Sequence, residues 1–238
     1  MIRFSDLESL GLSIAAMSER SDGDCRLPAA SNEFAGTDGR RKFLDSLGLD
    51  PARLVCVRQV HGTDVTGVSG QDRGRGGFDA ANARADSDAM ITSEPGMPIG
   101  ISVADCVPLI VFDPVVRAVA VGHAGRLGTM GNIADCIVEA MKVGFGSKPE
   151  ELHTVIGPSA GPQQYEVSEA IADEFASLDL PRNGRLLDLW GANRAQFERA
   201  GIPSHQVHVF GHCTMSDTRF FSHRGDGTGG RNLAVVSL

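Results

Sequence analysis

Cys106 and His123 are the two residues whose types and spacing could do chemistry together, because a predicted β-hairpin sets them side by side. Two apolar runs flank residues 113–116, whose sequence Asp-Pro-Val-Val is typical of a short hairpin loop. If Phe112 pairs with Arg117, the same register sets Cys106 directly opposite His123, on one face, with Cβ atoms about 4.5–5.5 Å apart. The pattern therefore predicts a thiol beside an imidazole at the open end of the hairpin.

This pair suits two kinds of chemistry and one structural role. A thiolate and an imidazole can both bind one zinc ion, at about 2.3 Å from sulfur and about 2.0 Å from nitrogen. Alternatively, His123 could deprotonate Cys106 and make it a nucleophile. In the structural alternative, Cys106 is a packing residue beside a hydrogen-bonded histidine, since free cysteine is often buried. All three depend on the register, because a shift of one residue would place the two side chains on opposite faces.

No other cysteine or histidine forms a comparable pair by spacing alone. The five cysteines contain no CxxC pair, so disulfide-redox and zinc-ribbon sites are not favoured. His61 follows a predicted strand and precedes a glycine, but no spacing rule brings it to Cys106.

Charge and hydropathy exclude several classes of partner. Lys+Arg 22 against Asp+Glu 30 gives a net charge of −8, which argues against nucleic acid or an anionic membrane as the main partner. No stretch approaches the roughly 18 apolar residues of a membrane helix, and the N-terminus lacks the pattern of a signal peptide. We therefore expect a cytoplasmic protein with reduced cysteines.

The elements that must position these residues predict an α+β fold. Near-continuous apolar strands in the middle of the chain require cover on both faces, by helices or by a second sheet. With no internal repeat or linker, the chain is expected to form mixed β-sheets with covering helices in one domain, residues 1–238. The glycine-rich stretch Gly67 to Gly77 predicts a mobile surface loop. The expected strands are 54–60, 89–92, 98–103, 107–112, 118–122, 154–157, 206–210 and 233–238, and the expected helices are 40–47, 131–143, 167–178 and 187–200.

Several separate motifs, in order and at the expected distances, resemble the YfiH-type laccase-domain family, also called the multicopper polyphenol oxidase or purine nucleoside phosphorylase family. The resemblance covers about residues 40–238. The motifs are Arg58-Gln59-Val60-His61-Gly62, Ala104-Asp105-Cys106-Val107-Pro108, Asp113-Pro114, His123-Ala124-Gly125, Ile156-Gly157-Pro158-Ser159, Tyr165-Glu166-Val167, Cys213-Thr214 and the segment from Arg219 to Gly227.

The resemblance implies a sandwich fold of the YfiH type with a mononuclear metal site. The ligands carried over from the family are His61, Cys106 and His123. Two histidines and one cysteine leave a fourth position open for water or substrate, which is typical of catalytic zinc. The same set superficially resembles a copper–thiolate site, so copper is the alternative metal.

The family activities imply a small-molecule substrate. They are phosphorolysis of adenosine, inosine or methylthioadenosine, and deamination of adenosine. Phosphorolysis needs groups that hold phosphate, and Arg58 and Arg224 are the candidates for this contact. Asp88 and Asp105 could orient a ligand imidazole, or serve only in a strand end or a turn.

The chain departs from the family pattern beside the expected site. Arg126-Leu127-Gly128 stands where the family has Trp-Arg-Gly, and His223-Arg224-Gly225-Asp226-Gly227 where it has Tyr-Arg-Arg-Asp-Gly. The changes remove a surface for base stacking and displace arginines. Besides a zinc-dependent nucleoside enzyme, three alternatives therefore stay open: a copper-linked polyphenol oxidase, a cysteine hydrolase or peptidoglycan-precursor editing factor, and a metal-binding relative without activity.

Overall fold

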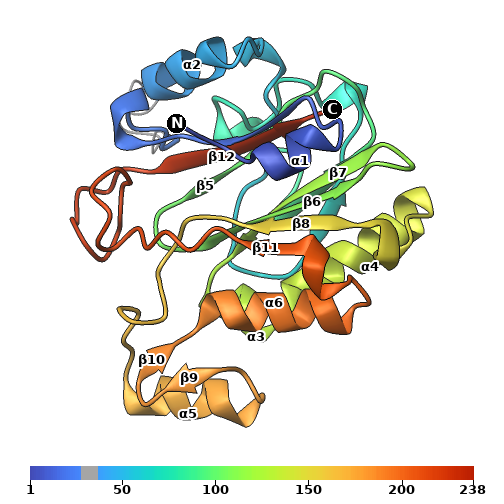
Figure 1. Ribbon diagram of the computed structural model, residues 1–238. Helices are drawn as coiled ribbons and strands as arrows, with labels where there is room; N and C mark the ends of the chain where they lie inside the picture. Colours follow the sequence, from blue (N-terminus) through green and yellow to red (C-terminus); the bar gives the residue numbers. More distant parts are fainter. Residues whose placement is uncertain (28–36) are drawn as a thin grey trace.

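Two β-sheets pack face to face and helices cover their outer faces in the computed structural model, which describes residues 1–27 and 37–238 (Figure 1). One sheet has the strand order β1-β2-β12-β5, and the other has the order β11-β8-β6-β7-β4-β3. This arrangement confirms the predicted α+β fold with mixed sheets. No helix in the described ranges is long and apolar enough to cross a membrane.

The strands of the four-stranded sheet are β1 (Ile2–Arg3), β2 (Ile14–Met17), β12 (Asn232–Ser237) and β5 (Ile99–Val103). Those of the six-stranded sheet are β11 (Val207–Val209), β8 (His153–Ile156), β6 (Val107–Asp113), β7 (Ala118–Ala124), β4 (Ala89–Thr92) and β3 (Val65–Gly67). The helices are α1 (Ser5–Ser9), α2 (Thr37–Ser46), α3 (Arg126–Met130), α4 (Ile133–Phe145), α5 (Glu169–Ser177) and α6 (Leu189–Arg199).

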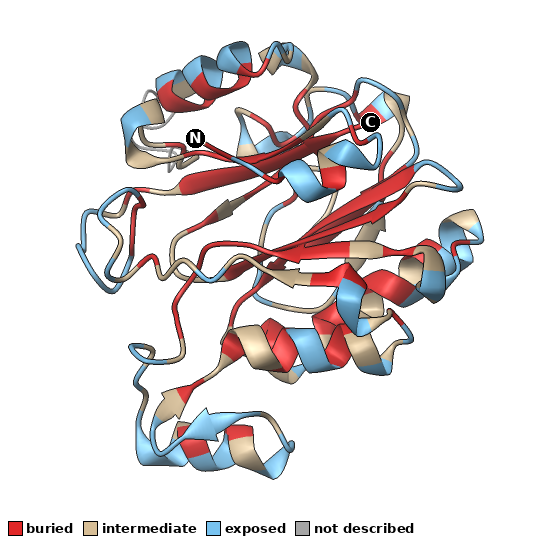
Figure 2. Ribbon diagram, in the orientation of Figure 1, coloured by how far each residue is buried: buried red, intermediate tan, exposed pale blue. Residues whose placement is uncertain are grey.

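The central strands β6 and β7 are buried along their whole length, as their unbroken apolar sequences predict (Figure 2). Along β6, Ile110 and Phe112 face the core between the sheets, while Leu109 and Val111 face the helices. Alternate side chains of a strand point to opposite faces, so one hairpin contributes to two cores. Cys106 and His123 have the parity of the face between the sheets.

Helices close the outer face of each sheet. On the six-stranded sheet, α4 packs closely against β7, where the Cδ1 of Ile137 would lie 2.4 Å from a Cβ added at Gly122, so a larger residue there would displace the end of the Ile137 side chain. On the four-stranded sheet, Phe43 and Leu44 of α2 pack with Leu233 and other residues of a third core. A smaller unit of α5 with the two-stranded sheet of β9 (Arg182–Asn183) and β10 (Leu186–Leu187) projects beyond these layers in Figure 1.

The β6–β7 hairpin has the predicted faces, but the predicted register was wrong. Val107 pairs with Ala124 and Pro108 with His123, a shift of two residues. Cys106 therefore lies just before β6 and diagonal to His123 rather than opposite it. A shift of two keeps both side chains on one face, whereas a shift of one would have separated them.

Turn chemistry explains the shifted register. The Oδ1 of Asp113 accepts hydrogen bonds from the backbone N–H groups of Val115 and Val116, at 2.8 and 3.0 Å. Asp113 pairs with Ala118, and Arg117 takes a left-handed conformation with φ of 58°. The loop is consequently 114–117 rather than 113–116.

Two further expectations were wrong. No continuous strand spans 54–60, where the backbone forms only isolated bridges at Val55 and Arg58. The glycine-rich stretch is not a simple surface loop, because it begins with the end of β3 and buries Asp72 and Gly76. A Cβ at Gly76 would lie 2.0 Å from the carbonyl oxygen of Cys56, so a glycine is required there.

Candidate metal centre

His61, Cys106 and His123 meet at one end of the space between the two sheets. Their ligand atoms, the ring nitrogens and the sulfur, all lie within 4.8 Å of one another. Cys106 comes just before β6, His123 lies near the end of β7, and His61 comes from the loop before β3. The two imidazole rings contact edge to face, with centroids 4.8 Å apart and an interplanar angle of 81°. Within the described ranges, this is the one cluster of three or more potential ligands.

Asp88 binds both histidine segments of the cluster. It is fully buried, and its carboxylate accepts the N–H groups of three successive residues, Val60, His61 and Gly62, at 3.2, 3.0 and 2.6 Å. These bonds hold His61 in a left-handed backbone conformation with φ of 61°, which is uncommon for a residue with a side chain. The Oδ1 of Asp88 also lies 2.8 Å from the Nδ1 of His123. This contact leaves the Nε2 of His123 available to a metal.

The electrostatics of the cluster favour a thiolate. Burial alone would raise the pKa of Cys106, but hydrogen bonds and positive charge from His123 and His61 outweigh it and lower that pKa. Burial opposes the charged form of His123, yet Asp88 and Cys106 raise its pKa. The thiolate is the form of cysteine that binds metals and attacks electrophiles. The geometry therefore suits a metal ligand and a nucleophile alike.

Gly125 permits the close approach of two members of the cluster. A Cβ at this position would lie 3.1 Å from the Sγ of Cys106 and 3.1 Å from the Cδ2 of His61. Gly125 is the residue before α3, and its extended backbone is open to any residue type. Glycine at this position thus leaves the ligand set space that a larger residue would narrow.

Asp105 has a different role from Asp88. Its carboxylate accepts hydrogen bonds from the hydroxyls of Thr214 and Ser222, at 2.8 and 2.7 Å, and from the N–H of Arg224, at 2.7 Å. It makes no contact with an imidazole in the described residues. Asp105 therefore holds the 213–226 segment next to Cys106, whereas of the two aspartates only Asp88 orients a histidine of the cluster.

The cluster forms part of the wall of a cavity of about 390 Å³. This volume is within the usual range for small-molecule sites. The side chain of Gln59 binds the backbone of Ser102 twice, donating to its carbonyl and accepting from its N–H, both at 2.9 Å. The residues that line the cavity are Gln59, His61, Ser102, Ala104, Cys106, His123, His223 and Arg231.

Arg231 is a lining residue that the sequence did not single out. Its guanidinium donates to the carbonyls of Gly229 and Gly230, at 3.0 and 2.9 Å, and has no carboxylate within 4.0 Å in the described chain. Arg231 directly precedes β12, which is the middle strand between β2 and β5. Only this long-range pairing brings residue 231 to the cavity, and the local sequence gives no sign of it.

Neither arginine predicted to contact an anion lines the cavity. Arg58 is exposed and pairs with Asp86. The Arg224 side chain donates to the carbonyl of Glu166, and its guanidinium lies 4.9 Å from the centre of the Tyr165 ring. The side chains of both residues are therefore already engaged elsewhere.

The residues that replace the family's Trp-Arg lie in α3. Leu127 is 53% exposed and offers no buried surface for a base. Arg126 donates to the sulfur of Met130 and lies 3.9 Å from Glu174, on the side of α5. At the second altered motif, His223 does line the cavity.

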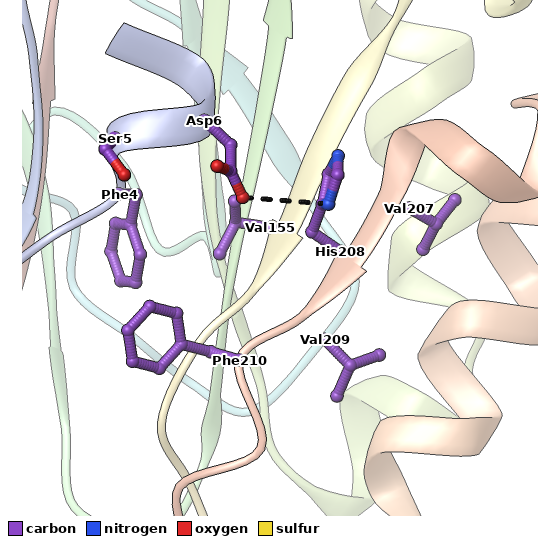
Figure 3. A pocket seen from close by; sticks show the side chains of 8 residues that line it. All are labelled: Phe4, Ser5, Asp6, Val155, Val207, His208, Val209 and Phe210. Carbon is purple, nitrogen blue, oxygen red and sulfur yellow. Dashed lines mark ion pairs between the residues drawn. The ribbon is translucent and has the colours of Figure 1, made fainter. Parts of the chain in front are cut away.

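A second cavity, of about 260 Å³, lies between α1 and β11 (Figure 3). Phe4 and Phe210 contact edge to face there, and Asp6 pairs with His208 at 3.7 Å. Its other lining residues are Ser5, Val155, Val207 and Val209. None of the predicted site residues belongs to it, so the cavity beside the cysteine–histidine cluster is the candidate site.

The chain is similar to several known proteins. The profile of a family described as multi-copper polyphenol oxidoreductase laccase matches residues 30–238. A relative from Geobacillus stearothermophilus named purine nucleoside phosphorylase YlmD is 34% identical over 245 residues, covering 94% of this chain and 89% of the relative. Another, named adenosine deaminase RL5 and from an unknown prokaryote, is 33% identical over 198 residues, covering 79% of this chain and 75% of that protein. The crystal structure of YlmD from Geobacillus stearothermophilus superposes with a TM-score of 0.87 at 32% identity, covering 94% of this chain and 91% of that one.

Proposed function

The chain belongs to the multi-copper polyphenol oxidoreductase laccase family, and we propose that it is a zinc-dependent enzyme that cleaves purine nucleosides by phosphorolysis. One observation carries the proposal: the cluster of His61, Cys106 and His123 and a further residue, Arg231, line one cavity. The ligand set for a metal and the cation proposed for phosphate thus belong to the same cavity.

The three clustered residues fit zinc by donor type and number. Two imidazoles and a thiolate are common zinc ligands, and three protein ligands leave one coordination position for a water or substrate atom. When bound, zinc supplies a Lewis acid at this position. The protein prepares the set by holding the Nδ1 of His123 on Asp88 and by favouring the thiolate form of Cys106.

The phosphate side of the reaction is assigned to Arg231. Phosphorolysis joins a phosphate oxygen to C1′ of the ribose and releases the purine base with the electrons of the glycosidic bond. The nucleophile carries negative charge, so a cation fixed beside it holds it against the sugar. Arg231 replaces the earlier candidates Arg58 and Arg224 in this proposal, because it lines the cavity and they do not.

Adenosine deamination is the second candidate reaction. It is favoured by the open position of a site with three ligands, since a metal there activates water for attack on the purine ring. A relative carries the name adenosine deaminase RL5. The two reactions differ in a simple requirement, because only phosphorolysis consumes phosphate.

Copper oxidation of phenols and cysteine-based hydrolysis are the alternatives that the experiments must separate. A copper oxidase would use the same cluster with another metal, and a hydrolase would use Cys106 as nucleophile with His123 as base.

All five cysteines are unpaired, which supports the proposed location in the reducing cytoplasm.

The first experiment measures the metal content of the purified protein and of the variant Cys106→Ala. We expect about one zinc per chain in the parent protein and almost none in the variant. Cys213→Ala is the matched control, because Cys213 is also partly buried but lies outside the cluster. Copper in place of zinc would favour the oxidase, and a folded parent protein without metal would contradict the zinc site.

The second experiment incubates inosine or adenosine with and without phosphate. Release of free base only when phosphate is present identifies phosphorolysis, and release of ammonia without phosphate identifies deamination. Bound zinc with no turnover of any purine nucleoside would contradict the proposed activity and favour a metal-binding relative without catalysis. Activity that survives zinc removal but is lost in Cys106→Ala would favour the cysteine hydrolase.

A further inference from the structure

Arg40 is a fully buried arginine whose hydrogen-bond partners in residues 1–27 and 37–238 are all neutral groups. It lies in α2, and no carboxylate pairs with it among the residues that the structure describes. Burying a charge is costly unless it is hydrogen-bonded, and here each of the three guanidinium nitrogens has at least one acceptor, four acceptors in all. The acceptors are the carbonyl oxygens of Cys25 and Gly77, both at 2.7 Å, the Sγ of Cys56 at 3.5 Å and the Oγ of Ser102 at 2.6 Å.

The bond from Arg40 determines what the hydroxyl of Ser102 can do. A guanidinium only donates, so the Oγ of Ser102 is an acceptor in this contact and its own hydrogen must go elsewhere. No described residue accepts that hydrogen. Ser102 lines the cavity, and Gln59 already binds both its N–H and its carbonyl. The hydroxyl hydrogen is therefore the one polar group of Ser102 still available to a ligand.

We propose that the hydroxyl of Ser102 donates a hydrogen bond to an oxyanion bound in the cavity, and that Arg40 is the positioning residue that keeps this hydroxyl a donor. Identification of the oxyanion as phosphate rests on the function proposed above. Arg231 supplies the charge at the same site, and Ser102 supplies a directed donor. Arg40 itself makes no contact with the ligand.

The test measures binding of inorganic phosphate to the zinc-loaded protein by calorimetry, without nucleoside. Ser102→Ala is expected to weaken phosphate binding by about tenfold or more, the usual effect of losing a hydrogen bond to a charged group. Ser102→Thr keeps the hydroxyl and should retain the affinity within about threefold. Ser237→Ala is the matched control, because Ser237 is a buried serine of β12 in the same sheet but away from the cavity.

A double-mutant cycle tests the role of Arg40. Arg40→Lys keeps a charge but cannot reach all four acceptors, so the hydroxyl of Ser102 is freed to turn. We expect this variant to weaken phosphate binding in the parent protein and to have no additional effect in the Ser102→Ala background. Additive effects of the two substitutions would overturn the positioning role. Thermal unfolding of each variant separates this readout from a loss of fold.

The outcomes distinguish this inference from the function on which it rests. Phosphate binding that is lost in Ser102→Ala, with no cleavage of nucleosides, would support the subsite and contradict the phosphorylase. Phosphorolysis with an unchanged KM for phosphate in Ser102→Ala would support the phosphorylase and overturn the subsite. Failure of the parent protein to bind phosphate at millimolar concentration would also overturn it.

Discussion

Asp88 and His123 are joined twice, once through their side chains and once through their backbones. The Oδ1 of Asp88 lies 2.8 Å from the Nδ1 of His123, and the N–H of His123 donates to the carbonyl of Asp88 at 2.7 Å. The same carboxylate accepts the N–H of His61. One buried residue therefore sets the position of both histidines of the cluster.

Substitution of Asp88 is expected to weaken metal binding without removing a ligand. Asp88→Asn should lower zinc affinity by about 10- to 100-fold, because the amide is a poorer acceptor for the three N–H groups and for His123. Competition with a chelator measures this change. Asp86→Asn is the control, since Asp86 is an exposed neighbour that pairs with Arg58. Equal zinc affinity in the two variants would show that Asp88 does not support the site.

A methyl group at Gly125 should damage the cluster and spare the fold. Gly125→Ala places a Cβ 3.1 Å from the Sγ of Cys106 and from the Cδ2 of His61, so both side chains must shift by a few tenths of an ångström. We expect zinc affinity to fall by at least about tenfold, with a change in unfolding free energy of about 1 kcal/mol or less. Gly67→Ala, where no atom lies within 4 Å of the added Cβ, is the control. A Gly125→Ala protein with normal zinc affinity would mean that the cluster tolerates a wider geometry.

Two of the arginines considered for phosphate, Arg231 and Arg58, should differ in their effect on the KM for phosphate. Arg231→Ala is expected to raise the KM for phosphate by about tenfold or more, because it removes the cation of the cavity. Arg58→Ala should leave that KM within about twofold, since Arg58 is exposed and pairs with Asp86. Initial rates at varied phosphate and saturating nucleoside measure both. An effect of Arg58→Ala equal to that of Arg231→Ala would restore the sequence-based assignment.

Acid should weaken the glycine-rich segment through Asp72. Burial would raise the pKa of this carboxyl, but the N–H of Ser69 and the guanidinium of Arg84, 2.8 Å away, hold that pKa below its ordinary value of 3.8. A group with a lowered folded pKa stabilises the protein above its unfolded pKa and loses this contribution as the pH falls.

Asp72→Asn should therefore lower the free energy of unfolding by about 1–3 kcal/mol at neutral pH. The difference from the parent protein should shrink below about pH 4, as the parent carboxyl becomes protonated. Urea unfolding at several pH values measures it, with Asp45→Asn on the exposed face of α2 as control. A difference that does not depend on pH would contradict the charge-based explanation.

The sequence predicted the parts of the fold that local patterns determine. The bounds of β4 match the expected range, and the apolar runs of β6 and β7 are buried as expected. The hairpin register was missed because it depends on Asp113 and on the left-handed Arg117, which apolar periodicity does not reveal. β1 and β2 were not predicted, because their pairing partners are each other and β12, far away in the sequence.

The candidate site, like the fold, was predicted where local patterns determine it and missed where long-range contacts do. Residue types and hairpin geometry brought Cys106 to His123, and only the family resemblance added His61. The left-handed loop that delivers His61 is held by Asp88, a contact across 27 residues. The roles of Arg231 and Arg40 were not predicted from the sequence, because they depend on neighbours that the two sheets bring together. No spacing rule contains those neighbours.

The place of β12 has a consequence for how the molecule is built during synthesis. This strand pairs with β2 on one side and with β5 on the other, and Ser237 lies opposite Ile14. The six-stranded sheet holds His123, and its strand β6 begins directly after Cys106. Its last strand along the chain ends at Val209, so all its strands are synthesised before β12. The four-stranded sheet must wait until β12 leaves the ribosome, and Arg231 is fixed only then. Pairing over so long a separation is slow, so the cysteine–histidine side of the cavity should mature before the arginine side.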